Sequence, residues 1–420
     1  MPFRIGLSGL NAAATDLKVT GNNIANAGTT GYKQSRADFT DVFAVAFGGT
    51  SQSATGNGVR VSGIAQEFSQ GSIEFSDKAL DLAISGSGFF ILDDSSGRTY
   101  SRNGSFNVNS SGDVVNSQNK LLQVFPVSSN ANSTSSTTFN TGALTSLNLS
   151  TTDGPPSATS QITAGLNLDA AAKPPLTTPF SQTDSTSYTS TTSVIVYDSL
   201  GANHTASLYY TKTANPNEWE TRMFVDNFEV DDTSNNSPSL ITFGADGTLA
   251  TPASGAIPYT PITSADLGLS TSIAPLDINM SYTSTTQFGN AFSVNQLAQD
   301  GFTSGRLSGI DIDKEGVVFA RYTNGQSTVL GKVALATFPN PQGLRQLGDT
   351  SWAETFESGI LPPGEAGTGS LGLFQSGALE ASNVDVATQL VNLITAQRSF
   401  QANAQVISAA DTVTQTIINI

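Results

Sequence analysis

The stretch FRIGLSGLNAAATDLKVTGNNI at residues 3–24 decides how this chain begins to fold. Its apolar residues at heptad spacing are Phe3, Leu7, Leu10, Ala14, Leu17 and Ile24. This a/d pattern is typical of a helix that packs along a coiled-coil seam. Gly28 and Gly31 then interrupt the pattern, as the end of a helix requires, so we expect a helix of about 24 residues.

Residues 386–417 carry a second heptad pattern. Its apolar positions are Val386, Leu390, Leu393, Phe400, Ala404, Ile407, Ala410, Val413 and Ile417. Ser382 is followed three residues later by Asp385, which is the spacing of a capping box with a short acid in place of Glu or Gln. We therefore expect a second helix from Asn383 to Ile420, about 38 residues long and roughly 57 Å from end to end.

The C-terminal helix is unusually poor in charge. Between Ser399 and Ile420 the only charged residue is Asp411, whereas a surface helix normally carries a charged outer face. An intramolecular helical hairpin would bury one stripe, but this helix needs burial on several sides, which other subunits supply most easily. The pattern thus predicts a self-assembling protein with an assembly interface at Phe3, Leu7, Leu10, Leu17, Ile24, Val386, Leu390, Leu393, Phe400, Ile407, Val413 and Ile417.

Between the two helices the sequence favours β-structure. Strands are expected at 89–92, 99–100, 113–115, 121–127, 193–197, 206–210, 219–225, 317–322 and 331–338. The dipeptides Asn103-Gly104, Asp246-Gly247 and Asn324-Gly325 predict tight turns with positive φ. The almost purely Ser, Thr and Asn stretch at 128–138, the segment 151–160 and the Gly/Pro-rich segment 359–372 are expected to be loops. The predicted fold is mainly β with terminal α-helices.

Composition excludes several classes of function. The net charge of −16 would repel nucleic acid and anionic membranes, so neither is an expected partner. The chain has no cysteine, which removes disulfides, thiolate catalysis and cysteine-based metal sites. No apolar run is long enough to span a bilayer, and the first 20 residues lack the pattern of a cleavable signal peptide.

Three patterns could suggest chemistry, and each has a plainer explanation. His204 is the only histidine and is expected in a turn between two strands, where no second ligand or activated nucleophile accompanies it. The GxGxxG match at 367–372 lies too far from the next helix to bind a nucleotide, and a loop is expected instead. The segment 311–316 resembles the start of a calcium loop but has Tyr322 where the bidentate Glu belongs, so a β-turn is expected. We predict no catalytic, metal or cofactor site, and no enzyme.

The N-terminal segment reads GNNIANAGTTGYK at 21–33, and the C-terminal segments read GALEASNVD at 377–385 and AQRSFQAN at 396–403. Through these segments, both ends of the chain resemble the flagellar rod/hook axial protein family. The motif residues are Gly21, Asn22, Asn23, Ile24, Ala25, Asn26, Thr30, Gly31, Tyr32, Lys33, Ser382, Asn383, Val384 and Asp385. Rod proteins of this family are much shorter, whereas 166–175, 196–201, 316–325 and 338–344 are similar to hook-protein segments.

The resemblance implies a nested domain order. Residues 1–30 and 383–420 would form a helical, coiled-coil-like assembly domain, and 31–85 with 360–382 an extended or β-hairpin connecting region. Residues 86–174 with 288–359 would form an inner β domain, and 175–287 an inserted outer β domain.

The resemblance also implies a function, a location and partners. Subunits would polymerise helically into a hollow, flexible tube that joins the basal-body rod to the filament and transmits torque as a universal joint. The chain would leave the cell through the flagellar type III export apparatus without a cleaved signal peptide and act extracellularly, in the hook. Its partners would be many copies of itself, the distal rod protein, the hook cap, and the hook-length control and hook-filament junction proteins.

In such a tube, a narrow uncharged stripe on the C-terminal helix would have a defined position. Thr388, Asn392, Thr395 and Ser399 recur at spacings of four, three and four, largely opposite the apolar seam. We predict that these four residues face the lumen. Two other identities stay open from the sequence: a distal rod or hook-associated axial protein, and a secreted β-rich adhesin.

Overall fold

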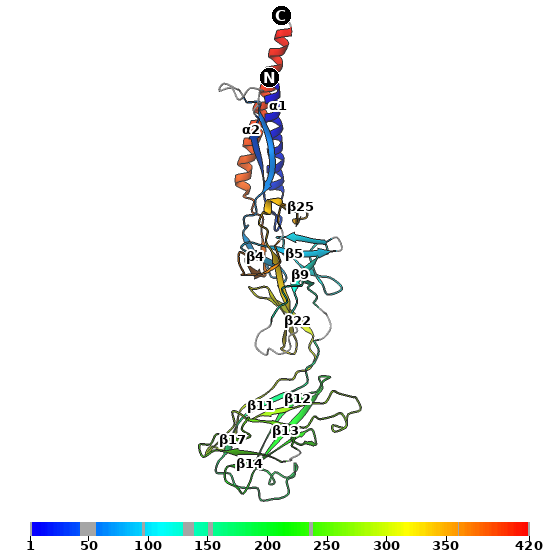
Figure 1. Ribbon diagram of the computed structural model, residues 1–420, viewed down its shortest axis with the longest axis vertical. Coiled ribbons are helices and arrows are strands. Elements are labelled where there is room, and N and C mark those ends of the chain that lie inside the picture. The colour runs from blue at the N-terminus through cyan, green and yellow to red at the C-terminus, as the bar shows by residue number, and fades with distance from the viewer. Residues whose placement is uncertain are drawn as a thin grey trace. The chain divides into compact units, whose positions relative to one another are not determined.

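The computed structural model describes residues 2–42, 56–94, 97–128, 138–149, 154–234, 238–359 and 361–418. A helix lies near each end of the chain, α1 (Pro2–Ala25) and α2 (Val386–Ile418), and β-strands make up most of the regular structure between them (Figure 1). The predicted class, mainly β with terminal helices, is confirmed. The chain divides into two compact units, unit 1 (residues 1–151, 309–321 and 327–420) and unit 2 (152–308 and 322–326).

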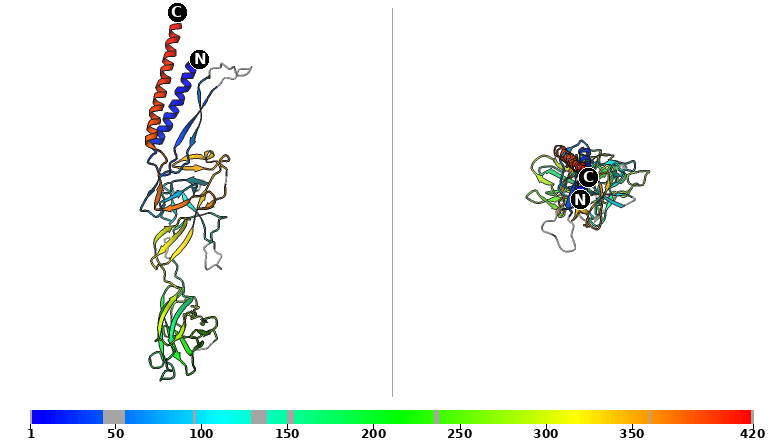
Figure 2. Two further views of the ribbon diagram at one scale, coloured as in Figure 1. Left: turned by 90° about the vertical axis from the view of Figure 1, so that its left-hand side faces the viewer. Right: turned by 90° about the horizontal axis from the view of Figure 1, so that it is seen from above.

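The two helices of unit 1 pack against each other, together with a β-hairpin. The hairpin consists of β1 (Ser35–Asp41) and β2 (Val59–Gln66), which pair antiparallel and contact α1. α2 runs beside α1 in the opposite direction, and its C-terminal end extends beyond the start of α1 (Figure 2). This arrangement brings the first and last segments of the chain together.

Below the helices, unit 1 contains a twelve-stranded sheet, of which only the ends of β22 and β23 belong to unit 2. Its central order is β22-β23-β24-β9-β5-β6-β26-β25. The strands are β5 (Phe89–Asp94), β6 (Gly97–Ser101), β7 (Asn107–Val108), β8 (Val114–Val115), β9 (Leu121–Phe125), β10 (Thr145–Ser146), β22 (Leu307–Ile312), β23 (Val317–Tyr322), β24 (Ser327–Ala336), β25 (Arg345–Gly348), β26 (Ser351–Ala353) and β27 (Gly364–Glu365). A short 3-10 helix, η1 (Pro341–Gly343), precedes β25.

Unit 1 also contains two small two-stranded sheets. In each, a strand that precedes the large sheet in sequence pairs with a strand that follows it in sequence. β3 (Ile73–Phe75) pairs with β29 (Ala378–Glu380), and β4 (Leu82–Ser85) pairs with β28 (Leu373–Ser376), both antiparallel. Buried side chains such as Phe90, Phe374 and Trp352 fill the core around these strands. The segments that lead into and out of the large sheet are therefore hydrogen-bonded to each other beneath the helices.

Unit 2 has its own two sheets and its own core. The first sheet consists of β12 (Ser190–Tyr197), β13 (Asn203–Lys212), β14 (Glu218–Val225), β15 (Phe228–Val230), β16 (Ser239–Phe243) and β17 (Leu249–Thr251). The second consists of β11 (Gln161–Asp169), β18 (Ala256–Pro258), β19 (Asn279–Ser281), β20 (Thr286–Phe288) and β21 (Ser293–Gln299). Alternate residues of β13 are buried, as expected for a strand with one face on a core. That core includes Trp219, Tyr210 and Tyr282.

Most local sequence predictions are confirmed, but not all of them. Gly247 and Gly325 have φ of +79° and +81° in turns between paired strands, as predicted. Asn103-Gly104 forms no hairpin turn: Gly104 lies against the Leu82 carbonyl, which leaves no room for a side chain. α2 begins at Val386, three residues later than predicted, and the next paragraph gives the reason. Residues 129–137 of the predicted polar loop lie outside the described residues.

Asp385, not Ser382, caps α2. The Asp385 carboxylate accepts a hydrogen bond from the Thr388 amide (2.9 Å), and its carbonyl accepts one from Gln389 (2.9 Å). The Ser382 hydroxyl accepts only a local bond from the Val384 amide. Asp385 was predicted as the distant member of a capping box, but it is the N-cap itself because a carboxylate oxygen satisfies the first free amides of the helix directly.

Candidate assembly interface

The two helices approach each other along a face of small residues on α1. Gly6 and Gly9 lie against α2, where a Cβ at Gly6 would be 2.9 Å from Ile407 Cγ1 and one at Gly9 would collide with the Asn403 side chain. Ala12 and Ala13 are also buried. Small side chains let two helix backbones come close together, so this face of α1 forms a close contact with α2.

On α2 the seam that faces α1 contains polar as well as apolar residues. Gln389, Ala396 and Asn403 recur at seven residues and alternate with Leu393, Phe400 and Ile407, and all six are buried or half-buried. Gln389 Oε1 accepts a hydrogen bond from Asn23 of α1 (3.4 Å). The sequence pattern predicted Leu393, Phe400 and Ile407 at this contact but not Gln389, Ala396 and Asn403. Hydrophobicity alone does not indicate that a side-chain amide or a small alanine is buried.

The remaining residues of the predicted interface are exposed to different degrees. Leu10, Leu17 and Ile24 are half-buried, whereas Phe3, Leu7, Val386, Leu390 and Val413 are each more than 40% exposed. The side chain of Ile417 lies outside the described ones. The predicted stripe is thus divided between the contact of the two helices and the outer surface of the pair.

That outer surface carries further large apolar side chains that lie outside the predicted interface stripe. They are Ile5 of α1, Val391, Ile394 and Val406 of α2, and Phe39 and Ile64 of the hairpin, each at least 40% exposed. Val391 is 63% exposed. Large exposed apolar side chains that gather on one element mark candidate sites of interaction with other proteins. The helix pair and its hairpin form the candidate assembly interface.

The predicted lumen-facing residues, Thr388, Asn392, Thr395 and Ser399, are all exposed in the single chain. Thr388 and Asn392 border a depression that is also lined by Asp16, Thr20 and Gln34. The Thr395 hydroxyl donates a hydrogen bond to the Val391 carbonyl of its own helix (2.9 Å). These residues form one uncharged strip along the edge of α2.

The N-terminal motif forms a hydrogen-bonded turn at the end of α1. Asn23 Oδ1 accepts hydrogen bonds from the Ser35 amide (2.9 Å) and the Tyr32 hydroxyl (3.2 Å), and its Nδ2 donates one to the Ser35 carbonyl (2.7 Å). Asn22 Nδ2 donates to the Tyr32 hydroxyl, and Asn26 Nδ2 donates to the Asn22 carbonyl. These side chains hold the chain in the turn that leads from α1 into β1.

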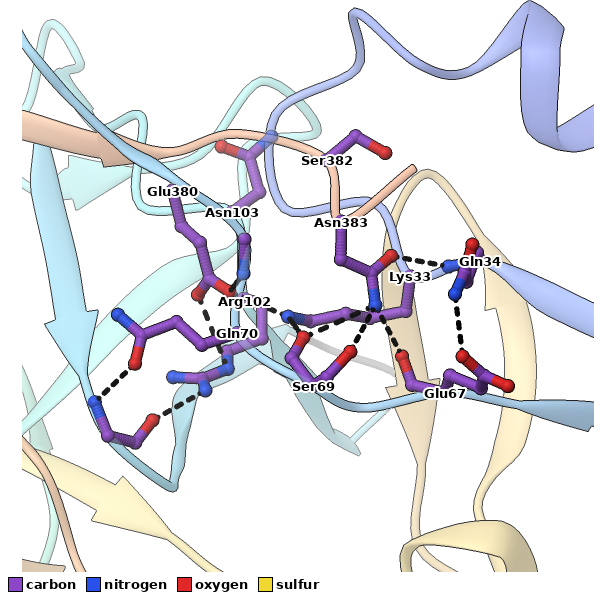
Figure 3. A network of polar contacts seen from close by, with 12 residues as sticks. Lys33, Gln34, Glu67, Ser69, Gln70, Arg102, Asn103, Glu380, Ser382 and Asn383 are labelled. Carbon is purple, nitrogen blue, oxygen red and sulfur yellow. Dashed lines mark hydrogen bonds and ion pairs between the residues drawn. The ribbon is translucent and has the colours of Figure 1, made fainter. Parts of the chain in front are cut away.

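The N-terminal and C-terminal motifs bind each other. The Gly31 amide donates a hydrogen bond to the Glu380 carbonyl (2.8 Å), and Asn383 Oδ1 accepts one from the Gln34 amide (2.8 Å). Asn383 Nδ2 donates to the Glu67 carbonyl (2.7 Å), next to the side-chain bond from Gln34 to Glu67 (Figure 3). Ile24, Thr30 and Val384 are half-buried around this junction, whereas Gly21 has no neighbour that a side chain would meet.

A buried ion cluster lies at the centre of this junction. Lys33 Nζ is 2.6 Å from Glu380 Oε1, with both side chains fully buried, and Arg102 Nε is 3.5 Å from Glu380 Oε2 (Figure 3). Burial lowers the pKa of Lys33, and the neighbouring Glu380 only partly offsets this effect. Burial also lowers the pKa of Arg102. Lys33 was part of the predicted motif. Nothing in the sequence pairs it with Arg102 or Glu380, which lie 69 and 347 positions further along the chain.

The patterns that suggested chemistry have structural roles. His204 lies at the start of β13 and not in a turn as predicted; it is buried, with Nδ1 2.9 Å from Asp226 and Nε2 3.5 Å from Asp198. The glycine-rich segment 367–372 joins β27 to β28 and opens no helix. The Asp313 carboxylate accepts hydrogen bonds from the Glu315 and Val317 amides in the β-turn predicted at 311–316.

The described part of the chain contains no cluster of His, Asp or Glu side chains able to hold a metal ion. Neither helix is long and apolar enough to cross a membrane over its described length.

Comparison with known proteins gives consistent matches along the chain. Residues 3–33 match the family described as flagella basal body rod protein, and 375–420 match the C-terminal region of flagellar basal body rod FlgEFG proteins. Residues 83–147 match the flagellar hook protein FlgE/F/G D1 domain, and 167–302 match the flagellar basal body protein FlaE D2 domain.

Full-length relatives include flagellar hook proteins FlgE from several bacteria. The protein of Escherichia coli (strain K12) is 37% identical over 426 residues, covering 100% of both chains. That of Borreliella burgdorferi is 33% identical, covering 99% of this chain and 98% of the relative. The crystal structure of Helicobacter pylori FlgE2 covers 73% of this chain at 13% identity with a TM-score of 0.49, a likeness too weak to add to the sequence matches.

Proposed function

Since this chain belongs to the flagellar hook protein family, FlgE, and is a structural subunit of the hook, we propose that it polymerises through its helix pair and hairpin. The full-length matches to hook proteins decide against the rod, hook-associated and adhesin alternatives. The single observation that carries the proposal is the apolar outer surface of the helix pair, where Val391, Ile394 and Leu390 are between 46% and 63% exposed. Covering such side chains is favourable by roughly 25 cal/mol for each Å² of apolar surface removed from water.

The test separates assembly from folding. Val391 contacts water in the single chain, so Val391→Asp should leave the folded monomer intact and abolish polymerisation, because a carboxylate would be buried between copies. Val391→Thr, which keeps the shape and adds no charge, is the matched control and should polymerise with a raised critical concentration. Sedimentation and electron microscopy measure the polymer, and circular dichroism measures the fold. Normal tubes from Val391→Asp would show that this surface is not the interface.

We also propose that the uncharged strip of Thr388, Asn392, Thr395 and Ser399 lines the channel of the tube. Its support is that the four side chains are exposed and neutral, so they would not retain passing unfolded proteins by charge. Because the chain has no cysteine, Thr395→Cys introduces a single thiol. In assembled tubes this thiol should react with a small reagent but be protected from one too large for the channel; equal reactivity with both would contradict the assignment.

The finer role of the polymer follows from composition. Only 12% of residues are charged, so contacts between copies would consist mainly of neutral polar groups, water and apolar surface. Such contacts slide more easily than ion pairs held in one geometry, which suits a joint that bends while it transmits torque. The proposed partners are other copies of the chain, the distal rod, hook-cap, hook-length control and hook-filament junction proteins, and the type III export apparatus.

A further inference from the structure

The buried ion cluster of Lys33, Arg102 and Glu380 joins segments that are far apart in the sequence, all within unit 1. Lys33 comes from the turn after α1, Arg102 follows β6 of the large sheet, and Glu380 ends β29. Lys33 Nζ also donates a hydrogen bond to the Ser69 carbonyl (2.7 Å), and Glu380 Oε1 accepts one from the Gly71 amide (2.9 Å). The cluster therefore holds four separate stretches of chain at one point (Figure 3).

The place of the cluster in the topology is as informative as its contacts. The helix pair and the β1–β2 hairpin connect to the sheets of unit 1 through two chain passages, 67–72 after β2 and 381–385 before α2. Ser69 and Gly71 lie in the first passage, and Glu380 immediately precedes the second. Arg102 connects the cluster to the sheets, since its Nη2 donates a hydrogen bond to the Gly86 carbonyl (2.6 Å). Every covalent route from the helices to the sheets thus passes through or beside these charges.

Net stability is a poor explanation for this arrangement. Taking charges out of water costs about as much as their attraction returns, and apolar residues of similar size often stabilise a protein equally well or better. The Arg102 Nη1 and Glu380 Oε2 atoms even lack a full hydrogen bond. A buried ion cluster can instead select one arrangement of the four stretches of chain, because any other arrangement would leave an ion buried without its partner.

We infer that Lys33, Arg102 and Glu380 are positioning residues that fix the orientation of the helix pair and hairpin on the sheets of unit 1. In the polymer this orientation determines how the helical layer is placed relative to the sheets of the same copy, so the inference deepens the proposed function and rests on it for that consequence. The orientation itself is a property of the single chain. It can therefore be measured without any polymer.

The experiment measures orientation and stability separately. Since the chain contains no cysteine, Gln401→Cys on α2 and Ser111→Cys before β8 provide two exposed sites for spin labels. Pulsed electron paramagnetic resonance on the full-length monomer gives the distribution of distances between them. Trp352 is buried in unit 1 and donates a hydrogen bond to Gln66 at the end of β2, so its emission alone could change with orientation. The signal that reports folding of unit 1 is therefore the cooperative urea transition of Trp352 fluorescence in a Trp219→Phe background.

Two variants remove the charges in different ways. The triple variant Lys33→Met, Arg102→Met, Glu380→Met makes the cluster apolar, and Glu380→Gln keeps its shape but removes the central charge. We expect both to keep the cooperative Trp352 transition and to lose the single narrow distance distribution of the parent. Arg36→Met is the matched control: it removes one cation three residues from Lys33, but the Arg36 side chain is 64% exposed, and the distribution should not change.

The outcomes are decisive in either direction. A narrow, unshifted distribution of spin-label distances in the folded variants would overturn the inference. The cluster would then be an ordinary structural ion pair, and removing its charges would change only the unfolding midpoint. If the triple variant fails to fold, Glu380→Gln decides alone. Failure of the proposed function would appear in the Val391→Asp polymerisation experiment and would leave the monomer distances untouched, so the two ideas can fail independently.

Discussion

At the scale of single residues, Gly31 shows why the N-terminal motif contains a glycine at this position. Its φ is +69°, and a Cβ there would lie 2.5 Å from the Asn103 backbone nitrogen, which cannot move aside as a flexible side chain could. Gly28, three residues earlier, has no such neighbour and no positive φ. We expect Gly31→Ala to destabilise unit 1 by about 1–3 kcal/mol, because it adds backbone strain to the steric collision.

Gly28→Ala is the control for this prediction and should change the stability of unit 1 by less than about 0.5 kcal/mol. Urea unfolding followed by Trp352 fluorescence in the Trp219→Phe background measures both variants. Equal effects of the two substitutions would mean that the close approach of Gly31 to residues 102–103 does not decide the choice of glycine.

Asp300 in unit 2 provides a prediction on pH. Partial burial raises the pKa of its carboxyl, but hydrogen bonds from the Ser160 hydroxyl and from the Gln161 and Ser160 amides outweigh this, so the pKa lies below its ordinary value. A carboxyl with a lower pKa in the folded state stabilises the fold above its unfolded pKa of about 3.9. This stabilisation is lost as the pH falls through the folded pKa.

Asp300→Asn should therefore lower the stability of unit 2 at neutral pH by less than about 1 kcal/mol, because solvent screens this exposed carboxylate, and should flatten the decline in stability on acidification. Thermal unfolding between pH 7 and acid, followed by Trp219 fluorescence in a Trp352→Phe background, measures both effects. Asp277→Asn, at an exposed aspartate of the same unit, is the control for the substitution itself and should change the stability of unit 2 at neutral pH by less than about 0.5 kcal/mol. An unaltered profile for Asp300→Asn would show that its hydrogen bonds do not favour the ionised form.

At the scale of elements, the start of α2 depends on one carboxylate. We expect Asp385→Ala to destabilise the first turn of α2 by about 1 kcal/mol, since the Thr388 amide would lose its hydrogen-bond partner. Ser382→Ala should have a much smaller effect because Ser382 bonds only to the Val384 amide. Amide hydrogen exchange at residues 386–389 of the monomer distinguishes the two variants. Faster exchange in Ser382→Ala than in Asp385→Ala would restore Ser382 as the cap.

The helices illustrate how far the sequence could predict this structure. Heptad spacing predicted both helices and placed Leu393, Phe400 and Ile407 on the contact face, because large apolar residues at period seven are a local signal. It could not show that Gly6 and Gly9 form a close contact with α2, since a glycine in a helix reads only as a weak helix former. The contact depends on the partner helix about 400 residues away.

The strands show the same division between local and distant information. Alternating apolar residues predicted β13 and β14 well, whereas alternation did not mark β1, β2, β11 or β21. β1 and β2 have few buried residues because they form a two-stranded hairpin beside a helix, so no strong alternation marks them. The junction of Lys33 with Glu380 is likewise hidden, because a buried ion pair leaves no periodic signal in the sequence.

At the scale of the whole molecule, the core of unit 2 shares no buried residue with the two core clusters of unit 1 over the described parts of the chain. The core of unit 2 extends from Ile162 to Tyr282, whereas the cores of unit 1 are built from residues 82–149 and 312–374. Each unit also contains one of the two tryptophans, Trp219 in unit 2 and Trp352 in unit 1, and both are almost fully buried. Each tryptophan therefore reports on one core alone.

We expect the monomer to unfold in two transitions, because each unit has its own cooperative core and cooperativity is a property of a single core. In urea, the Trp219→Phe and Trp352→Phe chains should give different midpoints, and Gly31→Ala should shift only the Trp352 transition. Asp300→Asn should shift only the Trp219 transition. Coincident midpoints that move together in both variants would mean that the two units fold as one cooperative body, and the stability of the helix pair would then depend on residues throughout the chain.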